Sequence, residues 1–127
     1  SDTTNYQYED MKAMDNFNVF LNSIREQVPS SYRWEKDDRF DAYLVVIGKN
    51  DSESVMGRLS GIFASRWDSS TLGNASKPEI RLAKEFGGIK NEQLLFTSLN
   101  GNAVFFGVWW PWGDNSRISL RVGAAKA

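Results

Sequence analysis

The dipeptide Asn100-Gly101 constrains the fold most, because it lies between two segments rich in apolar and aromatic residues. Asn-Gly is the strongest short-range signal for a two-residue β-turn, and a turn of that length sets which residues of the flanking strands pair. A two-residue turn at Asn100-Gly101 pairs Leu99 with Asn102 and, further from the turn, Phe96 with Phe105. The sequence therefore predicts an antiparallel hairpin centred on Asn100-Gly101.

A second reversal is predicted at Pro111–Asn115, a five-residue loop that leads into a third strand. This loop pairs Trp109 with Arg117 and Phe105 with Arg121. The two turns together put a set of apolar residues on one face, and a one-residue slip would scatter that set over both faces. The predicted core face of this meander consists of Leu95, Leu99, Val104, Phe106, Val108, Ile118, Leu120 and Val122.

The segment before the hairpin predicts three helices and one strand. Apolar residues at steps of three and four predict a long N-terminal helix that ends before Pro29. Phe40–Gly48 predicts a strand after a polar connection over residues 30–38, and its continuous apolar run suggests that both faces are covered. The residues expected to pack the N-terminal helix onto the core are Met11, Met14, Phe17, Leu21, Ile24 and Val28.

Capping residues mark the two remaining helices. Asn50 and Glu53 have capping-box spacing at the start of a second helix. Ser76 and Glu79 have the same spacing at the start of a third, short helix, which Gly87-Gly88 ends. The order helix, strand, two helices and three strands predicts an α+β fold with one mixed or antiparallel sheet. A length of 127 residues fits a single globular domain over residues 1–127.

Histidine and cysteine are both absent from the chain. Catalytic triads and dyads built on those residues are therefore excluded, as are zinc and copper sites that use them as ligands. The sequence predicts no catalytic residue, no metal site and no cofactor. No window approaches the roughly 18 apolar residues of a membrane helix, so no transmembrane segment is expected. The N-terminal residues lack a basic-then-apolar signal pattern, which favours the cytoplasm over secretion.

The face of the meander opposite its predicted core is the candidate binding surface. The predicted pairing places aromatic rings of the first two strands beside arginines of the third, and both residue types are enriched at interaction hot spots. The run Trp109-Trp110-Pro111-Trp112 leaves Trp112 at the tip of the second loop. The predicted binding residues are Phe96, Phe105, Trp109, Trp112, Arg117 and Arg121.

Three interpretations of this surface compete. In the structural interpretation, a helix covers the aromatic half, the arginines lie at its rim, and Trp112 folds back to cap the end of the sheet. In the favoured functional interpretation, the protein is a non-enzymatic module that binds a protein partner or a second copy of itself. In the other functional interpretation, it binds single-stranded nucleic acid or a small planar ligand, which the net charge of −1 disfavours.

Charge supplies two further observations. Residues 1–41 carry nine acidic and five basic side chains, whereas residues 42–127 carry seven acidic and ten basic side chains. An asymmetry of this kind can orient a molecule on a partner.

Acidic residues also crowd the entry to the predicted strand, where they allow a carboxylate-dependent enzyme of unknown reaction. Because Lys36 and Arg39 are interleaved with them, the expectation is a solvated charged loop. These acids are Glu35, Asp37, Asp38 and Asp41.

Overall fold

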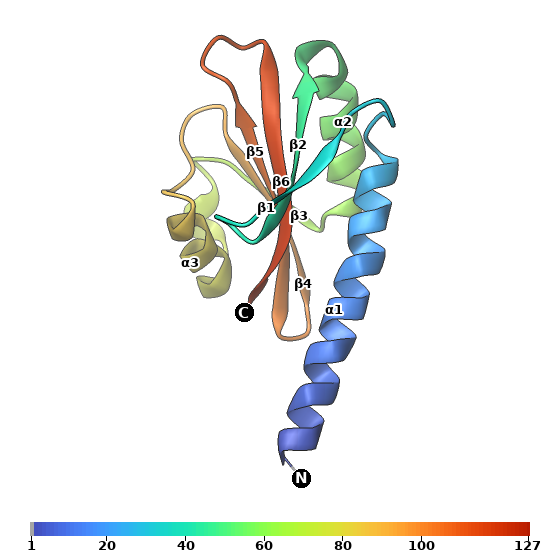
Figure 1. The fold of residues 1–127 in the computed structure, drawn as a ribbon. Helices are drawn as coiled ribbons and strands as arrows, with labels where there is room; N and C mark the ends of the chain where they lie inside the picture. The colour runs from blue at the N-terminus through green and yellow to red at the C-terminus, as the bar shows by residue number, and fades with distance from the viewer. Residues whose placement is uncertain (1) are drawn as a thin grey trace.

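The computed structural model describes the backbone of residues 2–127 and the side chains from Met11 onward. Helices and strands alternate irregularly along the chain, which makes the fold α+β as predicted (Figure 1). The elements are α1 (Asp2–Glu26), β1 (Trp34–Asp37), β2 (Ala42–Gly48), α2 (Lys49–Ile62), β3 (Ser65–Trp67), η1 (Leu72–Asn74), α3 (Lys77–Glu85), β4 (Leu94–Asn100), β5 (Ala103–Pro111) and β6 (Arg117–Lys126).

The strands form one six-stranded sheet in the order β1-β2-β6-β5-β4-β3, and every neighbouring pair is antiparallel. Helices α1 and α2 lie on one side of this sheet, which we call face A, and α3 lies on the other side, face B (Figure 1). β2, the strand predicted from Phe40–Gly48, joins the C-terminal meander by pairing with β6.

Two short strands at the sheet edges, β1 and β3, were not predicted from the sequence. β1 lies inside the expected polar connection, where three of its four residues are charged. Charged residues are common on edge strands because they discourage pairing with another molecule, so they hid the strand from a search for apolar alternation. β3 has only three residues and takes its structure from pairing with β4.

Each face of the sheet has its own apolar core. On face A, α1 and α2 pack against a cluster that includes Ile24, Val45, Leu59, Phe96, Trp109 and Leu120. On face B, α3 packs against a second cluster that includes Leu82, Ala83, Leu95, Val104, Phe106 and Val108. The predicted single core face of the meander is therefore divided between the two sides.

The pairing of β5 with β6 explains that division. Trp109 lies opposite Leu120, three residues further along than the predicted partner Arg117. Because side chains alternate along a strand, an odd shift exchanges the two faces of β6 relative to β5. Ile118, Leu120 and Val122 consequently point to face A, together with Trp109.

The shift arises because β5 continues through Pro111, where the sequence predicted the loop to begin. The Trp112 N–H donates to the Arg117 carbonyl at 2.8 Å and closes a shorter loop. Pro111 has no N–H to offer a neighbouring strand. It needs no partner on its other side, because β4 reaches only as far as Trp109, which pairs with Leu94.

The β4–β5 turn also differs from the prediction, but without changing the faces. Asn100 pairs with Ala103, so the two turn residues are Gly101 and Asn102, one residue later than expected. Leu99 now pairs with Val104, an even shift of two positions that preserves which side chains share a face. Leu99 itself lies at the end of the sheet and is 60% exposed, so its predicted core position is wrong.

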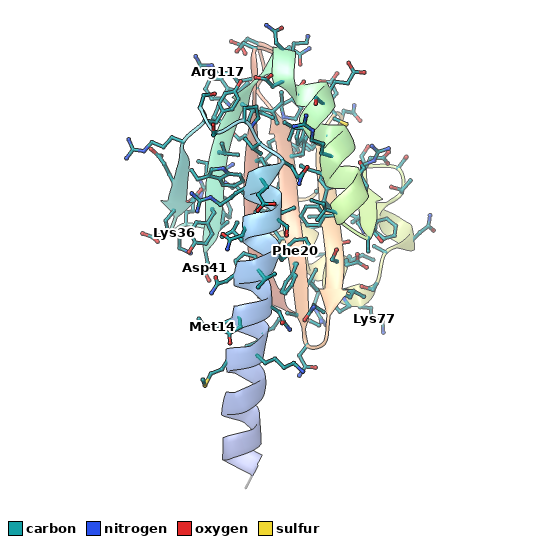
Figure 2. The ribbon with its side chains drawn as sticks, turned by 90° about the vertical axis from the view of Figure 1, so that its right-hand side faces the viewer. Met14, Phe20, Lys36, Asp41, Lys77 and Arg117 are labelled. Carbon is teal, nitrogen blue, oxygen red and sulfur yellow. The ribbon has the colours of Figure 1, made fainter. Side chains whose placement is uncertain are left out.

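Helix α1 covers the sheet with only its C-terminal half. Phe17, Leu21, Ile24 and Val28 pack on face A as predicted, and Phe20 joins them. Met11 and Met14, which were also predicted to pack there, are 64% and 67% exposed. The predicted apolar stripe is continuous, but its first turns run past the end of the sheet and have no strand beneath them (Figures 1 and 2).

The two shorter helices differ in how they begin. α2 starts at Lys49 without a side-chain cap, so the predicted capping box at Asn50 and Glu53 is wrong. α3 starts with the predicted capping box, in which Ser76 and Glu79 each bond the other's backbone.

Glu79 also ties α3 to the sheet. Its carboxylate accepts hydrogen bonds from the Trp67 indole at 2.8 Å and from the Thr97 hydroxyl. Burial raises the pKa of Glu79, but the hydrogen bonds from Thr97, Ser76 and Trp67 outweigh burial and hold that pKa below its usual value. This buried acid is thus fully engaged in holding α3 to β3 and β4.

Two leucine substitutions test the observed pairing. Leu120→Ala removes a fully buried side chain from face A and is expected to lower the free energy of unfolding by about 2–5 kcal/mol. Leu99→Ala, the same change at an exposed site, is expected to change the free energy of unfolding by no more than about 0.5 kcal/mol. Urea denaturation of both variants measures the difference, and equal costs would contradict the pairing.

Candidate functional site

One half of face B carries apolar side chains without a helix above them. Leu44 and Val46 of β2 point to face B, because they pair with Arg121 and Ser119 of β6. Both are only half-buried, and neither belongs to the cluster that α3 covers. We call this surface the open half-face; its residues are Leu44, Val46, Trp110, Trp112, Arg117, Ser119 and Arg121.

Arg121 forms the centre of the open half-face. Its Nε donates to Asp37 Oδ2 at 2.8 Å, and both side chains are 16% exposed. The guanidinium lies over two rings, 4.9 Å from the centroid of Trp110 and 5.3 Å from that of Phe40. Its two terminal Nη groups have no hydrogen-bond partner among the described residues. One edge of the guanidinium is therefore fixed, while the other is available to an acceptor.

Trp112 lies on the sheet although it follows β5 in the hairpin loop. Its Nε1 donates to Ser119 Oγ at 3.0 Å, and the Arg117 guanidinium lies 5.4 Å from its ring centroid. The indole is still 41% exposed. The structural interpretation is therefore correct for Trp112, because this residue folds back onto the sheet. Its ring also exposes an apolar surface to solvent.

Trp110 connects the open half-face to the covered part of face B. Its ring packs edge-on against Phe40 and Phe86, with centroids 5.9 and 5.7 Å apart. Its Nε1 is buried and has no hydrogen-bond partner among the described residues. An unpartnered buried donor of this kind lowers stability, so Trp110 is held in place by its ring contacts.

Arg121 also controls the charge state of Asp37. The hydrogen bond from Arg121 is the largest influence and holds the pKa of the Asp37 carboxyl below its usual value, against the opposing effect of burial. The Arg39 N–H, which donates to Asp37 Oδ1 at 3.1 Å, acts in the same direction. The carboxylate therefore stays ionised and keeps Arg121 oriented over the two rings.

The structure separates the six residues that the sequence placed in one binding surface. Phe96, Phe105 and Trp109 lie on face A and are 0%, 3% and 2% exposed. Phe17 and Phe20 of α1 pack on Phe105, with ring centroids 5.5 and 5.1 Å away. A helix thus covers the aromatic half, as the structural interpretation predicted.

The arginines do not lie at the rim of that covered face. Arg117 and Arg121 are on face B, so the predicted neighbours Trp109–Arg117 and Phe105–Arg121 are wrong. The odd shift between β5 and β6 is the reason. Arg117 and Arg121 instead meet Trp112 and Trp110, and only three of the six predicted residues, Trp112, Arg117 and Arg121, come together.

Sequence reasoning missed Leu44, Val46, Trp110 and Asp37. The signal for the first two was present, because the apolar run in β2 indicates a strand with two apolar faces. It was interpreted as coverage on both sides of the strand, whereas Leu44 and Val46 have no helix above them on face B and only Ala42 belongs to the cluster that α3 covers. Trp110 and Asp37 carried no such signal, since their contacts with Arg121 depend on tertiary structure.

The acidic residues around β1 do not gather into one site. Asp37 pairs with Arg121, Asp41 with Lys36 at 2.7 Å, and Glu35 lies 3.8 Å from Arg33. Among the side chains from Met11 onward, no group of three or more potential metal ligands is found.

Comparison with protein-family models, curated proteins and solved structures returns no significant match. None of the helices described for this chain is both long and apolar enough to cross a membrane.

The Asp37–Arg121 pair predicts a pH-dependent stability. Because the pKa of Asp37 is lower in the folded than in the unfolded chain, the pair stabilises the fold fully above the unfolded pKa of about 3.9. The melting temperature of wild type should therefore exceed that of Asp37→Asn at neutral pH. This difference in melting temperature should shrink as pH falls below about 4. Thermal melts across pH measure this, with Asp38→Asn as the neighbouring control. A difference that does not change with pH would contradict it.

Proposed function

We propose that this protein is a small non-enzymatic binding module whose open half-face binds an amphipathic helix of a protein partner. The observation that carries the proposal is the uncovered apolar surface of Leu44, Val46 and Trp112, bordered by Arg117 and Arg121. Aromatic residues and arginine supply much of the energy at protein interfaces.

The size of the open half-face supports a helix as the occupant. Ala42 belongs to the cluster that α3 covers, so the open part of β2 runs from Leu44 to Gly48, which at about 3.3 Å per residue gives roughly 16 Å. Three neighbouring strands, spaced about 4.8 Å apart, give a width near the 10 Å diameter of a helix. About 11 residues of a helix, or three turns at about 1.5 Å per residue, span that length. Globular partners usually bury about 800 Å² per side, far more than this area offers.

The arrangement of the covered surfaces supports the same occupant. α1 and α2 share face A, and α3 covers the half of face B over β4 and β5 (Figure 1). A fourth helix over β2 and β6 would complete the two layers that cover the sheet. Such a helix would remove Leu44 and Val46 from water, at a gain of about 25 cal/mol for each Å² of apolar surface.

The arginines determine the chemistry of the partner. The free Nη edge of Arg121 and the exposed guanidinium of Arg117 favour carboxylates, which accept two parallel hydrogen bonds from one guanidinium. The partner helix should therefore carry an apolar stripe flanked by aspartate or glutamate. Nucleic acid fits less well, because the net charge of the chain is −1 and all three predicted stacking rings, Phe96, Phe105 and Trp109, are buried.

A peptide selection tests the proposal. A displayed library of about 15-residue helical peptides should yield binders with an apolar stripe and acidic flanks. Trp112→Ala and Arg117→Ala should each lower the affinity for the selected peptides by about tenfold or more, as hot-spot substitutions do. Arg66→Ala, an exposed arginine on β3, is the matched control and should leave binding unchanged. The absence of selected peptides, or tighter binding to a single-stranded oligonucleotide, would contradict the proposal.

A further inference from the structure

The N-terminal half of α1 is a second surface without a partner. The helix runs past the end of the sheet, and its first turns project beyond the β4–β5 hairpin (Figures 1 and 2). We call residues 2–15 the arm. Met11 and Met14 of the arm are 64% and 67% exposed, although they continue the apolar stripe that packs from Phe17 onward.

An isolated helix of this length gains little from its own hydrogen bonds. Helices shorter than about 12–15 residues are marginal in water, and most helical stability comes from packing of an apolar face. The arm begins with Thr3, Thr4 and Asn5, which are weak helix formers. Contact with another surface would supply the stabilisation that the arm lacks.

We propose that the arm of one copy docks on the open half-face of a second copy. This inference rests on the proposed function and names the helix that the open half-face binds. The arm has 14 residues, or about 21 Å of helix, so about three of its turns can lie along the roughly 16 Å of β2 that is open on face B.

Charge favours this pairing. The arm contains four acidic residues and one lysine, whereas the open half-face contributes the exposed Arg117 and also Arg121, whose charge is already paired with Asp37. Asp15, the described acid of the arm, is exposed and lies next to Met14. Two acidic arms would repel each other, so an arm should bind the open half-face rather than a second arm.

The apolar contacts are also complementary. Methionine side chains are flexible and adapt to irregular surfaces, and the open half-face offers them Leu44, Val46 and the exposed ring of Trp112. An arm cannot reach the open half-face of its own chain, because α1 is one continuous helix on face A and the open half-face lies on face B. The contact must therefore join two molecules.

Sedimentation velocity over a wide range of concentration tests the inference. Wild type should increase in mass with concentration, as a closed pair or a longer chain of molecules. The double variant Met11→Asp/Met14→Asp should weaken association by at least about tenfold, and so should Trp112→Ala. Val19→Asp, an equally exposed apolar site on α1, is the matched control and should associate like wild type. Circular dichroism confirms that each variant is folded.

Mixing the two weakened variants gives the decisive result. The arm variant retains an intact open half-face, and Trp112→Ala retains an intact arm, so the mixture should associate although each variant alone does not. A monomeric wild type, or a mixture that stays monomeric, would overturn the inference. If wild type is monomeric while library peptides still bind, the proposed function stands and only self-docking fails. If wild type associates but the arm variant and Trp112→Ala associate equally well, the association uses another surface and only this inference fails.

Discussion

The pairing of β5 with β6 decides most of what distinguishes this protein. With Trp109 opposite Leu120, β6 directs its leucine, isoleucine and valine side chains to face A and its arginines to face B. Because strand side chains alternate, no local adjustment can exchange these two sets. The pairing depends in turn on the continuation of β5 through Pro111, which is possible because β4, the strand on the other side of β5, ends before that point.

This pairing creates two unequal sides. Face A receives Phe96, Phe105, Trp109 and Leu120 and is closed by α1 and α2, so its aromatic rings build the core. Face B is closed by α3 over only part of its area, and Arg121 organises the remainder between Asp37, Trp110 and Phe40. The surface most suited to recognition is therefore the one on which apolar residues stay partly exposed beside fixed charges.

Two features of the fold leave apolar side chains without a cover. The arm of α1 is an acidic helix that extends beyond its sheet, and the open half-face is a sheet surface without its helix. Each leaves apolar surface in water, and burial of that surface is the main driving force for association. Because the two features lie on opposite faces of the sheet, the contact that we propose between them joins two molecules.

The sequence by itself determined the elements whose signals are local. The capping box of α3, the apolar stripe of α1, the strand β2 and the two C-terminal reversals all follow from residue spacing. It also determined the residue types of the open half-face, aromatic rings beside arginines. Tertiary structure alone decided which rings meet which arginines, because a three-residue shift in the pairing of β5 with β6 exchanges the faces of β6. It likewise decided that Met11 and Met14 stay exposed and that Leu44 and Val46 lack a cover, since both depend on where other elements end.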